Sequence, residues 1–141
     1  MEAALAGLYR ALALYLPGDV LIADRVYPDE VPAGVVRPYW VFFFVSGGES
    51  NDVHRQDAEF VLTVKCVAET LAQSLDGAGR ISNKLNDAGR QDGAAAPIPG
   101  TSEWDILTVT QERTVHIVEK FEKAQPIYHD GNQYRFVMER K

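Results

Sequence analysis

The residues of this chain that are best suited to chemistry are one cysteine and three histidines. Cys66 lies on the apolar side of an alternating strand pattern with no neighbouring cation to lower its pKa, so the sequence predicts a buried structural cysteine rather than a nucleophile. His54, His116 and His129 fall in different segments and form no paired ligand motif, and His116 is expected in a solvated or hydrogen-bonding role. We therefore predict no catalytic residue, no metal site and no cofactor.

Two other patterns resemble chemical sites, but their context argues against them. Asp76–Gly79 contains two glycines, as a phosphate-binding loop does, yet it lies within a helical pattern and lacks the Lys-Ser/Thr pair. Asp24, Asp29 and Glu30 flank a proline-containing connection, where a solvated acidic rim is a simpler interpretation than a cation site. No nucleophile, base and orienting group come together, so we predict no enzymatic activity.

Composition narrows the class of protein. The 141 residues suit a single domain over 1–141, and the net charge of −6 argues against general nucleic-acid binding. Met1–Leu16 does not read as a signal peptide, and no segment approaches the roughly 18 apolar residues of a membrane span. A lone cysteine excludes an internal disulfide and fits a reducing compartment. The expected class is a soluble cytosolic domain.

The stretch Arg37–Ser46 is rich in aromatic and β-branched residues and predicts a strand. Its residues alternate between two faces, with Tyr39, Val41, Phe43 and Val45 on one and Trp40, Phe42 and Phe44 on the other. Because both faces are apolar, both must be covered. Only two convincing helices are available, and they cover one face. The second cover is either another copy of the protein or the last strands of the same chain.

The first half of the chain predicts a helix followed by a hairpin. Apolar residues recur at helical spacing over Glu2–Leu16, and Val20–Tyr27 is a short extended piece. After the aromatic strand, Gly47–Asp52 reads as a turn-rich polar tip. Asp57–Ala68 alternates cleanly and predicts the second strand of a long antiparallel hairpin.

A second helix is predicted from a capping box formed by Thr70 and Gln73 and ends near Gly89. The residues expected on its buried side are Leu71, Leu75, Ala78, Ile81 and Leu85. Gly77 and Gly79 lie inside this pattern and indicate either close packing against the sheet or a break into two shorter helices.

The last third begins with a mobile loop predicted at about residues 90–103, which has no periodicity. Extended segments are expected at Trp104–Thr110, Thr114–Phe121 and Gln133–Glu139, with Asp130-Gly131 as a turn before the last of them. The order of elements predicts an α+β domain. Its antiparallel β-sheet carries two main helices on one face, with a long hairpin and long polar loops.

The arrangement resembles the tail-completion proteins of long-tailed bacteriophages, which comprise tail terminators and tail-to-head joining proteins. The resemblance covers nearly the whole chain. It is carried by an opening helix (Glu2–Leu16), an Asp-Arg-Val-Tyr-Pro strand exit (Asp24–Pro28), a Pro-Tyr-entered apolar strand (Pro38–Ser46), a strand running into a helix (Phe60–Ala88) and a closing strand (Asp130–Phe136). The chain departs from the family pattern in an Ala/Pro/Gly insertion at 94–100 and in the two glycines of the second helix.

The resemblance implies a structural virion protein of the tail that is assembled in the host cytoplasm. Subunits would form a homo-oligomeric ring, commonly a hexamer, which caps the tail tube, ends its polymerisation and offers a surface to the head-tail connector protein. The ring would let DNA pass as cargo through its lumen, and no membrane contact is implied. We expect subunit contacts at Tyr39, Val41 and Phe43. The residues expected to contact partners are Gly47, Gly48, Glu49, Asn51, Asp52, His54, Asp92, Pro97, Ile98 and Pro99.

Two alternatives remain open from the sequence. One is a head-side connector or adaptor ring protein, which would use the same ring geometry. The other is a small monomeric ligand-binding or enzymatic α+β domain, with a pocket rimmed by Asp24, Asp29, Glu30 and His116.

Overall fold

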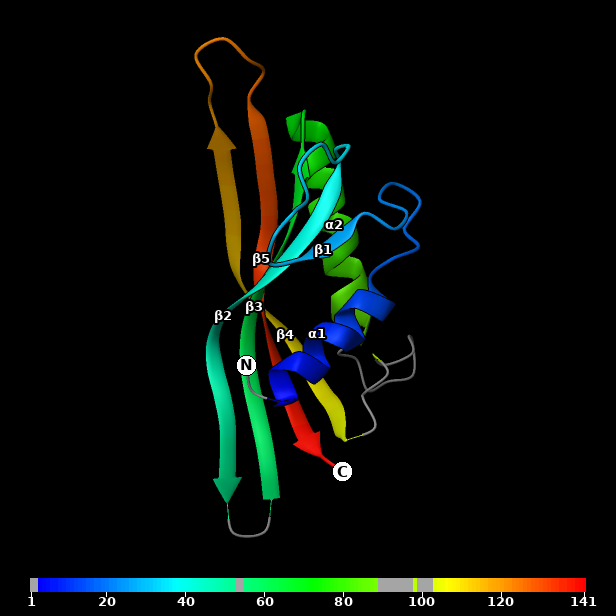
Figure 1. The fold of residues 1–141 in the computed structure, drawn as a ribbon, viewed down its shortest axis with the longest axis vertical. Helices are drawn as coiled ribbons and strands as arrows, with labels where there is room; N and C mark the ends of the chain where they lie inside the picture. Colours follow the sequence, from blue (N-terminus) through cyan, green and yellow to red (C-terminus); the bar gives the residue numbers. More distant parts are fainter. Residues whose placement is uncertain (1–2, 53–54, 89–97, 99–102) are drawn as a thin grey trace.

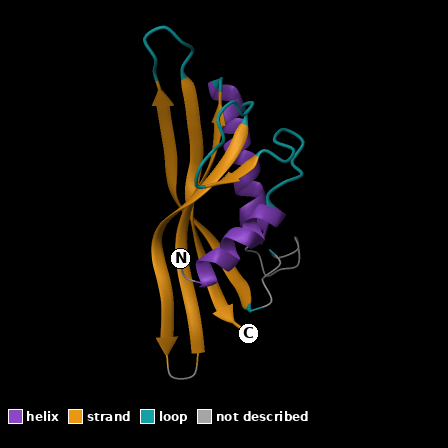
Figure 2. Ribbon diagram, in the orientation of Figure 1, coloured by secondary structure: helices purple, strands orange, loops and turns teal. Residues whose placement is uncertain are grey.

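The computed structural model describes residues 3–52, 55–88, 98 and 103–141. Its elements follow the order α1 (Ala3–Tyr15), β1 (Val26–Pro28), β2 (Tyr39–Asp52), β3 (Arg55–Ala68), α2 (Leu71–Ala88), β4 (Trp104–Glu119) and β5 (Ile127–Arg140). The five strands form one sheet in the order β1-β2-β3-β5-β4, and both helices lie on the same side of it (Figures 1 and 2). The predicted α+β class is confirmed. The sheet is mixed, because β1 runs parallel to β2 while the other pairs are antiparallel.

The β2–β3 hairpin is longer than the sequence predicted. Gly47–Asp52 was expected as a polar turn, and that prediction is wrong, since these residues continue β2 and pair with β3 as far as Asp52 and Arg55. Gly47 explains part of the error. It has a φ of +124°, and a Cβ at this position would lie 2.0 Å from the Glu59 carbonyl oxygen. The glycine therefore allows two backbones to approach at an irregularity in the strand rather than turning the chain.

The last two strands also differ from the prediction. The segments expected at 104–110 and 114–121 form one strand, β4, with a register shift between Gln111 and Thr114. Asp130-Gly131 was predicted as a turn, which is wrong because both residues lie inside β5. A Cβ at Gly131 would lie 2.2 Å from the Val64 carbonyl oxygen, so the residue serves close packing of β5 against β3.

Helix α2 is continuous, and its two glycines differ in role. The Gln73 backbone N–H donates to Thr70 Oγ1 at 3.2 Å, as expected for the N-terminal cap. A Cβ at Gly77 would lie 2.2 Å from Cys66 Sγ, whereas one at Gly79 would meet nothing within 4 Å. Gly77 therefore lets the helix pack closely on β3. Gly79 has no comparable packing reason.

One helical face was misassigned from the sequence. Leu71 and Leu75 were predicted to be buried, but they are 43% and 53% exposed. Ser74 faces the sheet instead and is fully buried, as are Ile81 and Leu85, which were expected there. The reason is a shift of the buried stripe, which follows Ser74, Gly77, Ile81 and Leu85 because the small residues permit closer contact.

Helix α1 packs Leu5, Leu8 and Leu12 into the core beside β1 and β2. Its Tyr9 hydroxyl donates to Asp29 Oδ1 at 2.7 Å and accepts from the Phe44 backbone N–H at 2.9 Å, so one side chain joins the helix, the loop after β1 and β2. Burial and the hydrogen bond to Asp29 raise the pKa of Tyr9 to about 12. The largest fully buried core residues are Trp40, Tyr134, Phe42, Phe60, Phe136, Leu8, Leu12, Leu16, Ile22, Leu62, Ile81 and Leu85.

Two hairpins project from opposite ends of the molecule (Figure 1). The β2–β3 hairpin extends past the start of α1 at one end, and the β4–β5 hairpin extends past the start of α2 at the other. Among the described residues, no helix is long and apolar enough to cross a membrane.

Candidate assembly surfaces

The face of the sheet opposite the helices, here called the open face, carries the three predicted subunit-contact residues. Alternation along β2 places Tyr39, Val41 and Phe43 on this face, because Trp40 and Phe42 lie on the helix side in the core. Tyr39 and Phe43 are partly exposed, while Val41 is buried between its neighbours. Neither α1 nor α2 covers the open face, so within the described residues no helix shields these aromatic rings from another molecule (Figure 2).

Neighbouring strands extend this apolar surface across the sheet. The Tyr27 and Tyr39 rings meet edge to face, with centroids 5.9 Å apart. Lys65 Nζ lies 5.5 Å from the centroid of the Phe43 ring, and burial lowers the pKa of this lysine. Tyr39 pairs with Val67, Val67 with His129, and His129 with Ile117, so Ile117 of β4 lies on the open face as well. Ile117 is 47% exposed. The result is an apolar strip that contains Lys65, with the carboxylate of Glu119 near enough to this lysine to act on its pKa.

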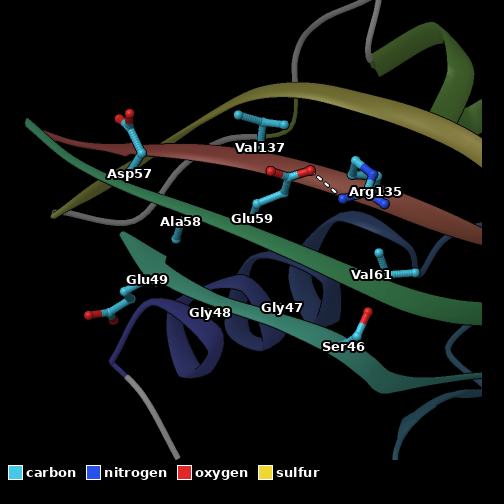
Figure 3. A pocket seen from close by; sticks show the side chains of 10 residues that line it. All are labelled: Ser46, Gly47, Gly48, Glu49, Asp57, Ala58, Glu59, Val61, Arg135 and Val137. Carbon is cyan, nitrogen blue, oxygen red and sulfur yellow. Dashed lines mark hydrogen bonds and ion pairs between the residues drawn. The ribbon is translucent and has the colours of Figure 1, made fainter. Parts of the chain in front are cut away.

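Towards the β2–β3 end, the open face is hollowed into a shallow depression of about 560 Å³ (Figure 3). It is lined by Ser46, Gly47, Gly48, Glu49, Asp57, Ala58, Glu59, Val61, Arg135 and Val137. The small residues of β2 leave the space open. Arg135 stands at its side and forms ion pairs with Glu59 and Glu112, which raise the pKa of its guanidinium. Its charge is already neutralised, so the depression is not an anion site.

The predicted partner-contact residues at the β2–β3 hairpin have different surroundings. Gly47, Gly48 and Glu49 line the depression, and Glu49 Oε1 accepts a hydrogen bond from the Ala4 backbone N–H at 3.2 Å. This contact places a carboxylate at the N-terminus of α1, where the helix dipole favours negative charge. Asn51 and Asp52 belong to the paired end of β2.

The remaining predicted contact residues lie in or near the long insertion. His54, Asp92, Pro97 and Pro99 lie outside the described residues. Ile98 is described, and it is only 3% exposed and belongs to the hydrophobic core. Its side chain therefore does not present a surface to a partner, contrary to the expectation from its Pro-rich setting.

Sequence reasoning missed a polar cluster beneath α2, in which Ser74 and Asp130 are buried and the His116 side chain is 51% exposed. The Ser74 hydroxyl, from α2, donates to Asp130 Oδ2 at 2.6 Å, and His116 Nδ1, from β4, bonds the other carboxylate oxygen of Asp130 on β5. Asp130 is 3% exposed. No sequence signal was available, because the three residues are distant in the chain and Asp130-Gly131 read as a turn.

This cluster does not form a nucleophilic site, although it contains serine, aspartate and histidine. Nucleophilic serine chemistry needs the histidine to accept the serine proton, with the aspartate orienting the histidine. Here the carboxylate lies between the other two, and Ser74 is fully buried. The arrangement satisfies a buried charge with two hydrogen bonds, which is a structural role.

The other residues considered for chemistry are Cys66, the potential metal ligands and the residues of the predicted acidic pocket. Cys66 is fully buried, as predicted, and burial raises the pKa of its thiol to about 12. No group of three or more potential metal ligands occurs within the described part of the chain. The pocket of the monomeric alternative does not form, since Asp24, Asp29 and Glu30 flank β1 at one edge of the sheet and His116 lies on β4 at the other.

Comparison with known proteins gives structural neighbours among solved structures but no match to a family model or to a curated protein. Searches against protein-family models and against curated proteins found nothing that matches. Among solved structures, the chain is similar to a chain from the virion of a native gene transfer agent particle, with a TM-score of 0.74 and 16% sequence identity. The match covers 99% of each chain. This protein therefore shares its whole fold with a chain of that particle.

Proposed function

We propose that this protein is a structural virion protein of a phage-like particle, and that it acts as a tail terminator. The observation that carries the proposal is the similarity of fold over the full length of both chains to a chain of a gene transfer agent virion. The resemblance in the order of elements to tail-completion proteins points the same way. The absence of a nucleophilic arrangement around Ser74 and Asp130 fits a structural role.

In this proposal, copies of the chain form a ring, commonly a hexamer, around a lumen through which DNA passes. Tyr39, Val41 and Phe43 contribute to the contact between subunits, because the aromatic residues among them lie partly exposed on a face that no helix covers. The net charge of −6 would keep DNA from adhering to the ring.

The two projecting hairpins give the two ends of the molecule different surfaces, which could bind different partners. The β2–β3 end carries Gly47–Asp52, and the loop after β4 carries Lys120, Phe121 and Lys123, with Phe121 47% exposed. A terminator must bind the last ring of the tail tube without offering the same surface again, since a repeating heterologous contact would polymerise. We assign the tail tube and the head-tail connector protein to these opposite ends. Asp92, Pro97 and Pro99 of the insertion remain proposed contacts.

Solution mass gives the first test. Light scattering on a sizing column, across a range of protein concentrations, is expected to find a discrete species near the mass of a hexamer. Negative-stain images of that species should show a ring. A monomer at every concentration, with no ring in the images, contradicts the ring proposal and favours a monomeric domain.

Disruption of the gene in a particle-producing cell distinguishes a terminator from a head-side connector. Loss of a terminator is expected to give tubes of uncontrolled length and no joined particles. Loss of a head-side connector gives tails of normal length that remain unattached to heads. Deletion of 94–97, which retains the core residue Ile98, should impair joining, and normally joined full-length tails would contradict the proposed role of the insertion.

A further inference from the structure

A second exposed apolar patch lies on the helix side of the sheet. Leu71 and Leu75 of α2 are 43% and 53% exposed, and Val118 and Tyr128, paired in register on β4 and β5, are partly exposed on the same side. We call these four residues the helix-side patch. The open-face patch consists of Tyr39, Phe43, Lys65 and Ile117. Single exposed apolar residues are ordinary, but two clusters on opposite faces of one small domain indicate contact surfaces.

The two patches overlap in level along the molecule. Tyr39 and Ile117 belong to one row of paired residues that also contains Val67 and His129, and this row is next to the pair of Val118 and Tyr128. Phe43 pairs with Thr63 and lies four residues further along β2. A contact between different patches of identical copies is heterologous, and it closes into a ring only when successive copies are not displaced along the axis. Overlap in level on opposite faces fits that condition.

Charge favours pairing of the two different patches over self-pairing of the open face. Within the described residues, Lys65 forms no ion pair, although Glu119 partly offsets the lowering of its pKa by burial. Face-to-face contact of two open faces would place two half-buried lysines on one interface. The helix-side patch begins next to Glu69, whose side chain is 64% exposed and forms an ion pair with Arg37 at 3.6 Å. A carboxylate beside the leucines suits a partner surface that contains a lysine.

From these observations we infer that the helix-side patch of one copy, led by Leu71 and Leu75, docks on the open-face patch of the next copy, around Phe43 and Lys65. The occupant of the open face is thus a second copy of this chain in a head-to-tail arrangement. The inference rests on the proposed ring and specifies its contact, which the ring proposal alone leaves undefined.

Thiol cross-linking tests this arrangement directly. Phe43→Cys and Leu75→Cys are prepared as separate variants of the full chain, mixed in equal amounts and treated with a short bis-maleimide. Cross-linked dimers are expected in the mixture and not with either variant alone, because residue 43 never meets residue 43. A chain that carries both substitutions should give a ladder that ends at the ring size. Tyr39→Cys replaces Phe43→Cys if the latter fails to fold.

Controls make each outcome decisive. The wild-type chain, whose only thiol is the buried Cys66, serves as the blank, and Leu14→Cys on α1, 86% exposed and outside both patches, should not cross-link to Leu75→Cys. Dimers from Phe43→Cys alone would show self-pairing and overturn the inference. A ring by light scattering that gives no mixed cross-link would overturn this contact but leave the ring proposal standing. Monomers throughout would contradict both.

A charge at the helix-side patch provides a second test. Leu75→Glu is expected to dissociate the ring to monomers while the monomer keeps its urea midpoint, because Leu75 is half exposed within the chain. The matched change Leu14→Glu should leave the ring intact. A ring that survives Leu75→Glu contradicts the docking contact.

Discussion

The two faces of the sheet hold apolar side chains in different environments. On the helix side, large residues such as Trp40, Phe42 and Phe60 are fully buried beneath α1 and α2. On the open face, small residues such as Val67 are buried between their neighbours, while Tyr39 and Phe43 remain partly exposed beside Lys65. One strand, β2, contributes aromatic residues to both faces. The helix side therefore supplies the large residues of the core, and the open face is the surface that we propose for assembly.

Truncation of adjacent residues of β2 is the strongest test of the difference between the helix side and the open face. Trp40→Ala removes a fully buried side chain and should lower the free energy of unfolding by about 3–5 kcal/mol. Tyr39→Ala, one position away on the open face, should cost less than half as much, since its ring is already partly in water. Urea denaturation of the monomeric protein measures both. Equal losses would show that the open face also supports the isolated fold.

The polar cluster beneath α2 gives the next effect in size. Asp130→Ala leaves the Ser74 hydroxyl and His116 without their shared acceptor and should cost about 3 kcal/mol. Asp76→Ala, which removes an exposed ion pair with Arg80, is the matched control and should leave stability almost unchanged. A small effect of Asp130→Ala, comparable to the control, would mean that the cluster does not hold α2 on the sheet.

Substitution of the two glycines of α2 by alanine should change the free energy of unfolding in opposite directions. Gly77→Ala forces a Cβ to within 2.2 Å of Cys66 Sγ and should cost about 1–3 kcal/mol through displacement of the helix. Gly79→Ala meets open space and should stabilise by up to about 1 kcal/mol through helix propensity. Thermal unfolding of the two variants separates them. Stabilisation by both would contradict the close helix–sheet contact at Gly77.

These glycines also show how far the sequence could predict the structure. The capping box at Thr70, the apolar strand after Pro38 and the α+β class were recoverable from local pattern, since each depends on neighbouring residues. Dipeptides typical of turns gave wrong predictions at positions where tertiary contacts determine the backbone conformation. Gly47 and Gly131 lie inside strands because another backbone comes too close for a side chain, and such proximity leaves no trace in a single sequence.

Of the two candidate surfaces, one could be placed from the sequence and the other could not. Alternation along β2 correctly placed Tyr39, Val41 and Phe43 on the face opposite Trp40, because a strand has a strict period of two. The helix-side patch was missed, since Leu71 and Leu75 fit the apolar stripe of a buried helix face. Only the small residues Ser74 and Gly77, which rotate the helix onto the sheet, explain why these leucines face outward.

The smallest predicted effect concerns pH and a histidine of the open face. His129 is buried next to Glu119, with which it bonds through Nε2, and its Nδ1 has no hydrogen-bond partner among the described residues. Burial lowers the pKa of His129, and nearby Lys65 lowers it further, while Glu119 partly opposes both. The folded protein thus disfavours the charged ring.

The sign of the pH dependence follows from that lowered pKa. The unfolded chain takes up a proton near the ordinary histidine value of about 6.5, whereas the folded chain does so only at lower pH. The unfolded state therefore binds more protons in this window, and the free energy of unfolding falls as the pH decreases from about 7.5 to 5.5. His129→Gln should flatten this slope, as measured by urea denaturation at several pH values. An unchanged slope would assign the pH dependence to other groups and would mean that the open face at His129 is more hydrated than its burial indicates.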